Sequence, residues 1–236
     1  MSVMYVDIAT IPDFKLGTRL YDLHELSEQD VARVMATKSR ENSSNPGDLG
    51  QHMLQVAAMS FLLHDDNGIK IRSAGVSGST EAAMLQTLQQ LMVEDKPSVV
   101  TWDGKRSILP VLNYRYLSHG LSSPQLINHV DLAVELSGSS EQDSASLHEV
   151  AVLCGFPGNR ALSSDDVLNA YLEGNIGLIQ NNLEQNIMNT WLLNQRWKLL
   201  CGKLDHSSHE IEYQQFKEAL LKQNKAHLTN FAESMT

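Results

Sequence analysis

The sequence predicts a mixed α/β domain in which helices cover a sheet. Three observations lead to this prediction. Short apolar runs typical of strands fill the first part of the chain, a strand–helix–strand unit follows, and from about residue 144 onward apolar residues recur at helical spacing. We expect an antiparallel meander of three strands, further parallel strands, and a helical layer formed by the C-terminal part.

Five segments are expected to form strands. They are residues 3–9, 53–64, 68–75, 98–102 and 125–129. The first is an apolar run that holds a single acid, Asp7, and ends before Pro12. Asn67-Gly68, between the second and third segments, predicts a hairpin with a type I′ turn, because both residues tolerate positive φ.

Periodicity also predicts the helices and their connections. The expected helices are residues 27–38, 81–94, a segment from Leu109 to Tyr116, and residues 145–154, 163–173, 175–201 and 207–230. Residues 39–51 are polar and rich in Ser, Asn and Gly, which indicates a loop. A weak boundary near residues 202–208 divides the chain into a domain of residues 1–202 and a helical extension of residues 203–236 packed on it.

Charge and cysteine content exclude some classes of protein. The 236 residues contain 18 Lys and Arg against 28 Asp and Glu, a net charge of −10. A generally basic nucleic-acid coat is excluded, although a local basic groove is not. Cys154 and Cys201 lie in apolar segments, which indicates buried free thiols in a reducing compartment. With no signal peptide and no apolar run long enough to cross a bilayer, we expect a soluble cytoplasmic protein.

Four ordered segments carry a family resemblance. They read VDIATIPD from Val6, TWDG from Thr101 with LPVLNYR from Leu109, LCGFPG from Leu153, and EQNIMNTWLL from Glu184. Together they resemble the bacterial family of predicted 3′–5′ exonucleases related to the proofreading domain of family-B DNA polymerases. Its patterns are approximately D-I-E-T-[IV]-P-D, W-N-G-x-x-F-D-L-P-V-L-x-x-R, L-L-G-F-P-G-K and Y-C-x-x-D-V-L-N-T-Y-L-L. The resemblance runs from about residue 3 to residue 200. It implies the ribonuclease H-like fold of the DEDD exonucleases.

The resemblance also implies a reaction, two-metal phosphodiester hydrolysis. Four carboxylates would hold two Mg²⁺ or Mn²⁺ ions about 4 Å apart, and a tyrosine would position the attacking water. This sequence departs from that set. Asp7 is retained, but Ala9 stands at the partner Glu position, Ile108 at the second-motif Asp, Asn182 at the Tyr and Asn186 at the last Asp. Three of the four ligand positions are therefore neutral, and we expect no bound cofactor, with Asp7 a metal ligand at most.

Nearby acids are not expected to replace the missing ligands. Glu184 lies two residues from Asn186 on a helix, which turns it about 200° away from the site. Asp103 lies on a turn, and Asp13 follows a proline after the strand. The segment His129-x-Asp131 also fits a family pattern, but we expect Asp131 to cap the following helix.

The remaining histidines and tryptophans have structural interpretations. His148 is expected at the surface, and His206 and His209 lack a third ligand for a metal site. Trp102 and Trp191 lie in apolar segments and are expected in the core rather than as base-stacking platforms.

The sequence thus favours a catalytically inactive homologue with one of two roles. One is a protein-interaction or structural subunit, with a protein partner or a second copy of the chain. The other is a non-hydrolysing binder of single-stranded nucleic acid, in which Lys105, Arg106 and Arg115 would contact phosphates; solvated charge explains these three residues equally well. A third hypothesis is residual metal-dependent 3′–5′ exonuclease activity that uses Asp7 with a ligand outside the family pattern.

Overall fold

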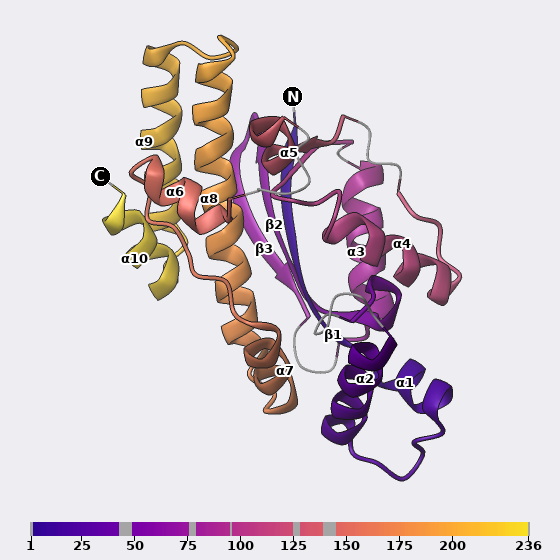
Figure 1. Cartoon of the computed structure of the whole chain (residues 1–236). Coiled ribbons are helices and arrows are strands. Elements are labelled where there is room, and N and C mark those ends of the chain that lie inside the picture. Colours follow the sequence, from indigo (N-terminus) through magenta and orange to yellow (C-terminus); the bar gives the residue numbers. More distant parts are fainter. Residues whose placement is uncertain are drawn as a thin grey trace.

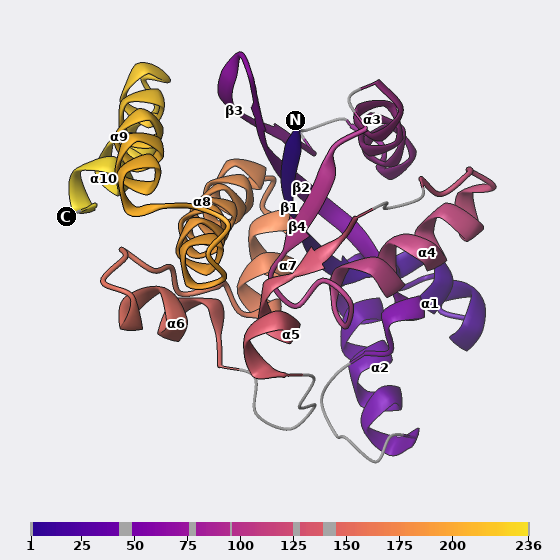
Figure 2. The same ribbon diagram turned by 90° about the horizontal axis from the view of Figure 1, so that it is seen from above.

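The computed structural model describes residues 2–42, 49–75, 79–94, 96–124, 128–138 and 145–235. Its centre is a five-stranded sheet with the order β3-β2-β1-β4-β5, and helices lie on both of its faces (Figures 1 and 2). The strands are β1 (Val3–Pro12), β2 (Leu54–Asp65), β3 (Gly68–Ala74), β4 (Ser98–Thr101) and β5 (Val130–Asp131). β1, β2 and β3 pair antiparallel, whereas β4 pairs parallel with β1 and β5. The expected mixed sheet is confirmed.

The helices divide between the two faces and one end of the sheet. They are α1 (Phe14–Tyr21), α2 (Glu28–Asn42), α3 (Glu81–Glu94), α4 (Ile108–His119), α5 (Leu132–Ser137), α6 (Leu147–Leu153), α7 (Ser164–Leu172), α8 (Ile176–Leu200), α9 (His206–Lys222) and α10 (Ala226–Ser234), with a 3₁₀ turn at Gln51–Met53. The long helix α8 crosses one face, with α6, α9 and α10 outside it, and α3 and α4 cover the other face (Figure 2).

Side chains alternate along β1, so that the strand contributes to a core on each face of the sheet. The same alternation sets the face on which Asp7 lies. Tyr5 belongs to the apolar cluster under α8, where the rings of Trp191 and Phe216 stack at 4.0 Å between centroids. Met4 and Val6 belong to the cluster under α3 and α4. Because successive side chains of a strand point to opposite faces, Asp7 shares the face of Tyr5 and points toward α8.

The hairpin of β2 and β3 forms as predicted, but its turn differs. Asp65 pairs with Gly68 across the turn. Gly68 has a positive φ of 105°, whereas Asn67 does not have a positive φ, so the turn is not type I′. The Asp65 carboxylate accepts a hydrogen bond from the Asn67 N–H at 2.7 Å. This side-chain bond closes the turn without a left-handed asparagine.

Several predicted boundaries are wrong. α2 continues to Asn42, into the expected loop, and residues 43–48 lie outside the described residues. The last strand is at Val130–Asp131 rather than residues 125–129, of which 125–127 lie outside the described residues.

Residues 207–230 form two helices rather than one. α9 and α10 are separated at Asn224, which has a positive φ of 53°. The chain reversal lets Phe216 and Leu220 of α9 share the core under α8 with Leu228 of α10. The apolar faces of α9 and α10 are both buried in this arrangement, which explains why the helix is interrupted although the helical periodicity continues.

The structure also bears on the two cysteines and on the expected lack of a membrane-spanning segment. Both cysteines are free, but Cys201 ends α8 and is exposed, so the expectation of two buried thiols is wrong for this residue, while Cys154 is half-buried. No helix in the described ranges combines the length and apolar character that a bilayer span requires.

A buried carboxylate attaches the last helix to the sheet and to α8. Glu184 is only 1% exposed. It accepts hydrogen bonds from Ser73 Oγ of β3 at 2.7 Å, from Lys225 Nζ at 2.9 Å and from His227 Nε2 at 2.6 Å. Glu184 therefore faces away from Asp7, as predicted, and its charge is used to hold the C-terminal layer.

We predict that Glu184→Ala lowers the free energy of unfolding by about 2 kcal/mol, because three donors lose a buried acceptor. The matched control is Glu218→Ala, which removes an exposed partner of Lys222 and should cost less than about 0.5 kcal/mol. Urea unfolding of both variants measures the difference. Equal effects would show that the Glu184 contacts do not stabilise the C-terminal layer.

Candidate functional site

The retained acid of the family pattern, Asp7, lies half-buried on β1, next to a β-bulge. Its Oδ1 accepts a hydrogen bond from the Ile8 N–H at 2.9 Å. Its Oδ2 accepts a hydrogen bond from Asn186 Nδ2 of α8 at 2.8 Å. Both carboxylate oxygens thus already accept N–H groups of the chain itself.

A chain of amide hydrogen bonds fixes the orientation of Asn186. Asn159 Nδ2 donates to Asn186 Oδ1 at 2.8 Å and to the Asn182 main-chain oxygen at 3.0 Å. The Asn182 side chain accepts from the Leu162 N–H at 3.3 Å and donates to the Arg160 carbonyl at 3.1 Å. With its oxygen occupied by Asn159, Asn186 must turn its NH₂ group toward Asp7.

The other two family ligand positions are apolar and belong to the core. Ala9 is 7% exposed and lies opposite Ala58 of β2. Ile108 is 3% exposed at the start of α4 and packs in the cluster that contains Val6 and Val111. Neither position offers an oxygen atom to the space beside Asp7.

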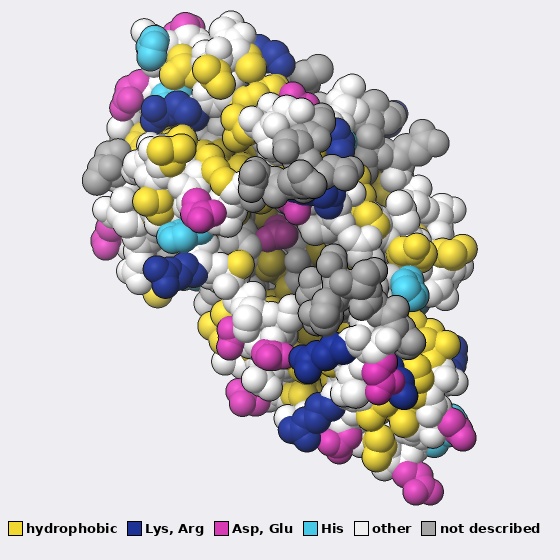
Figure 3. Space-filling view, in the orientation of Figure 1, with side chains coloured by type: hydrophobic (Ala, Val, Ile, Leu, Met, Phe, Trp, Pro, Cys, Tyr) yellow, Lys and Arg dark blue, Asp and Glu magenta, His cyan; other side chains and the backbone are white. Residues whose placement is uncertain are grey.

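A cleft of about 680 Å³ opens beside Asp7. It is walled by β1, the segment after β4, the start of α6, residues 159–161 and α8. Figure 3 shows this face hollowed near its centre, with an acidic side chain in the hollow. Trp102 lines the cleft and is half-buried, so it is not fully a core residue, whereas Trp191 is fully buried as expected.

Other acids of the cleft already have partners. Asp103 accepts a hydrogen bond from Arg106 Nε at 2.6 Å. Glu149 accepts hydrogen bonds from the main chain and hydroxyl of Ser146, as part of a capping box. Asp13 lies elsewhere, where it caps α1.

Burial raises the pKa of Asp7 from its usual value near 3.8 to about 6. The hydrogen bonds from Asn186 and Ile8 oppose this shift only in part, because both donors are neutral.

The donor set does not fit the pair of divalent ions that the family resemblance implies. Within the described ranges, no three His, Cys, Asp or Glu side chains are placed to hold a metal ion. Asn186 presents its NH₂ group to Asp7, and an amide nitrogen does not coordinate Mg²⁺ or Mn²⁺. We therefore derive no catalytic step through metal ions.

The three basic residues expected at phosphates differ in their surroundings. Lys105 is exposed. Arg106 pairs with Asp103, and its carbonyl accepts from Gln51. Arg115 is 6% exposed, is bound to two carboxylates and does not line the Asp7 cleft, so the structure does not bring it together with Lys105 and Arg106.

Asp131 is a helix cap, as predicted, and also anchors a wall of the cleft. It is fully buried and accepts from the Ala133 N–H at 3.2 Å at the start of α5. It also accepts from the Asp103 N–H at 2.9 Å and the Lys105 N–H at 2.8 Å. These bonds hold the turn after β4 in a conformation in which Asp103 has a positive φ of 54°.

Sequence reasoning missed two residues of the cleft. Asn159 stands where the third family pattern ends in Lys, and that difference was the available signal. His148, expected at the surface, lines the cleft, and its Nδ1 is buried without a hydrogen-bond partner among the described residues. Nothing in the sequence around His148 distinguishes it from a surface residue.

The fold resembles that of part of a DNA polymerase. It is similar to the family B DNA polymerase from the hyperthermophilic archaeon Pyrobaculum calidifontis, with a TM-score of 0.55 and 14% identity. The similarity covers 98% of this chain and 27% of the polymerase chain, so this chain spans about a quarter of the polymerase's length. Together with the mixed sheet, the match shows an α/β fold of the ribonuclease H-like type.

The family follows from the sequence match. A family model described as a predicted 3′–5′ exonuclease related to the exonuclease domain of PolB matches residues 49–128 and 126–235. The chain belongs to this family. The matched ranges begin after β1, so Asp7 and Ala9 lie outside them. A comparison with curated proteins gives no match.

We predict that Asp7 titrates near pH 6, with a measurable effect on stability. Its pKa is raised in the folded state, so its stabilising contribution is complete below the unfolded pKa and is lost as pH rises through about 6. Relative to Asp7→Asn, the wild type should lose on the order of 1–3 kcal/mol between about pH 4 and pH 8. Carbon NMR of the carboxyl group measures the pKa directly, and a value at or below 4 would contradict the prediction.

Asn186→Asp should place a second carboxylate against Asp7. At about pH 8 we expect a loss of about 1–3 kcal/mol in the free energy of unfolding, partly recovered with Mn²⁺ and reduced at acidic pH, where the pair can share a proton. Thermal unfolding with and without Mn²⁺ measures both effects. Asn181→Asp, which adds the same charge at an exposed position of α8, is the control and should show neither effect.

Proposed function

We propose that the protein is a non-hydrolysing member of its family that binds single-stranded nucleic acid in the Asp7 cleft. The observation that supports the loss of hydrolysis is the 2.8 Å hydrogen bond from Asn186 Nδ2 to Asp7 Oδ2. It directs an N–H donor at the one retained carboxylate, where the family pattern has a second acid. Two divalent cations need several anionic oxygens, and this arrangement offers one carboxylate.

Binding is supported by two hollows that share a lining residue. A groove of about 870 Å³ runs between α2 and α7, and Ser107 lines both this groove and the Asp7 cleft. Arg33 and Arg40 of α2 line the groove, and the exposed Arg160 lines the cleft. In Figure 3, Lys and Arg side chains gather below the hollow. A single strand could follow these charges, with phosphates near the arginines and a base near Trp102.

The neutral positions also support binding without a metal. In an acidic nuclease site, the carboxylates repel phosphates unless cations lie between them. Here Ala9, Ile108 and Asn186 remove three such charges, and Asn159 and Asn186 add amides that can hydrogen-bond to a sugar or base edge. Free cysteines support a cytoplasmic location for this role.

Two measurements test the proposal. Calorimetric titration with Mn²⁺ should show no saturable binding, and two tight sites would overturn the loss of hydrolysis. Fluorescence anisotropy with a 5′-labelled strand of about 12 nucleotides, in EDTA, should show affinity that falls steeply with salt.

Variants locate the binding. Arg40→Gln combined with Arg160→Gln should weaken binding about tenfold, because two phosphate contacts are lost. The matched control, Lys70→Gln combined with Arg72→Gln, removes two exposed charges of β3 that line neither hollow, and it should have no effect.

The outcomes also separate the alternatives. No binding of DNA or RNA at low salt would contradict the proposal and favour a protein-interaction subunit, with a protein partner or a second copy of the chain. Nucleotide release from a 3′-labelled strand in Mn²⁺, abolished by Asp7→Ala, would instead favour residual exonuclease activity.

A further inference from the structure

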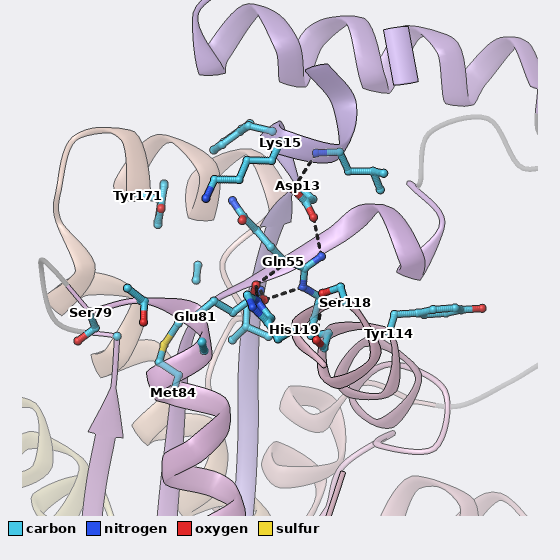
Figure 4. Close-up of a pocket in the computed structure, with 18 of the residues that line it drawn as sticks. Asp13, Lys15, Gln55, Ser79, Glu81, Met84, Tyr114, Ser118, His119 and Tyr171 are labelled. Atoms are coloured by element: carbon cyan, nitrogen blue, oxygen red, sulfur yellow. Dashed lines mark hydrogen bonds and ion pairs between the residues drawn. The ribbon is translucent and has the colours of Figure 1, made fainter. Parts of the chain in front are cut away.

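Another cavity, of about 900 Å³, opens where α1, α3, α4 and the junction of α7 and α8 meet β2 (Figure 4). It shares no lining residue with the Asp7 cleft or with the groove beside it. Its volume lies within the range of small-molecule sites. The cavity is therefore a candidate site that is independent of the function proposed above.

The floor of this cavity is a buried, rigidly held arginine. Arg115 Nε and Nη2 donate to the two carboxylate oxygens of Glu81 at 2.8 and 2.6 Å, and Nη1 donates to Asp13 Oδ2 at 2.5 Å. The side chains of Arg115 and Glu81 are 7% and 10% exposed. These bonds lock the guanidinium plane and use three of its five N–H groups.

Each carboxylate oxygen of the two acids of the floor already accepts at least one hydrogen bond. Glu81 also accepts from the Val56 N–H at 2.6 Å and contacts His119 Nε2 at 2.8 Å, and Asp13 accepts from the Leu16 N–H at 3.0 Å. The free donors of the floor are the two remaining N–H groups of Arg115. A ligand that reaches these N–H groups needs an acceptor to pair with them.

The walls add unpaired polar groups and an apolar side. The side chains of Lys15, Gln55 and Tyr171 line the cavity and have no hydrogen bond or ion pair within the described ranges. In Figure 4, Lys15 extends from α1 toward the side on which Tyr171 lies. Met84 and Ile176 supply buried apolar surface.

The charged side chains at the rim of the cavity favour a negatively charged ligand. Arg115 is outweighed by the two carboxylates of Glu81 and Asp13, so this cluster has a net charge of −1 and attracts an anion only through the direction of its N–H groups. Lys15 and Arg19 bring two exposed positive charges to the rim, against one exposed acid, Glu28. The cavity therefore combines N–H donors, a net positive rim and an apolar wall.

We propose that this cavity binds an aromatic heterocycle joined to a phosphate monoester, a ligand with the size and chemistry of a nucleoside monophosphate. The phosphate, which only accepts hydrogen bonds at neutral pH, contacts Lys15, Arg19 and the free N–H groups of Arg115. The ring packs on Met84 and Ile176. The amide of Gln55, a donor and an acceptor, meets the polar edge of the ring.

Calorimetry on the full chain tests the proposal with adenosine 5′-monophosphate, adenosine and inorganic phosphate as probes. The monophosphate should bind saturably, and both fragments should bind at least about tenfold more weakly, because each lacks part of the contacts. Lys15→Gln combined with Arg19→Gln should weaken binding of the monophosphate about tenfold. The control, Lys70→Gln combined with Arg72→Gln, should bind as the wild type does.

Amide chemical shifts locate the bound probe. The monophosphate should perturb Ala57, Ser79 and Tyr171, and not Asp7 or Asn186. Four results would each overturn the proposal: no binding of the monophosphate, equal affinity for inorganic phosphate, insensitivity to the double variant at Lys15 and Arg19, or shift changes confined to the Asp7 cleft. These results are independent of whether the Asp7 cleft binds a single strand.

Discussion

The hydrogen bond from Asn186 to Asp7 joins the centre of the sheet to its longest helix, and it forms only because residue 186 is an amide. A carboxylate there would have no proton to donate at neutral pH and would set two like charges against each other. The amide oxygen of Asn186 is in turn held by Asn159, which fixes the segment that walls the cleft. One substitution thus sets the charge of the site and the position of its wall.

Local rules predicted the parts of the fold that depend on neighbouring residues. The hairpin followed from Asn67-Gly68, and the role of Asp131 as a cap followed from its place before an apolar helix. The direction of Glu184 followed from helix geometry alone, because two residues along a helix correspond to about 200°. The turn of the hairpin differed because the Asp65 carboxylate, rather than backbone preference, closes it.

Features that depend on distant residues could not be predicted in this way. α1 is only eight residues long and contains Gly17, so its apolar periodicity is too weak to predict a helix. Gly17 is needed because a side chain at this position would collide with Met35 of α2, and the sequence does not reveal that contact. The burial of Arg115 against Asp13 is one such feature, because nothing in its segment reveals a partner 102 positions earlier in the chain. Asn159 bonds to Asn186, which lies 27 positions later in the chain. The only sign of this role in the sequence is that Asn159 departs from the family pattern.

The net charge of −10 does not decide whether this protein attracts an anion, because charge acts locally in salt. At physiological ionic strength exposed charges are screened within about 8 Å, so remote surface acids contribute little inside a cleft. The most buried acids, among them Glu81, Asp131 and Glu184, are occupied by N–H donors that hold the fold together. Asp7 itself is a half-buried carboxyl with a raised pKa that contacts a neutral amide, and the other acids of the cleft, Asp103 and Glu149, pair with Arg106 and Ser146. The proposed binding of a phosphate without a metal therefore depends on the charges within a few ångströms of the site, where three positions that are acidic in the family pattern hold Ala9, Ile108 and Asn186, and not on the net charge of the chain.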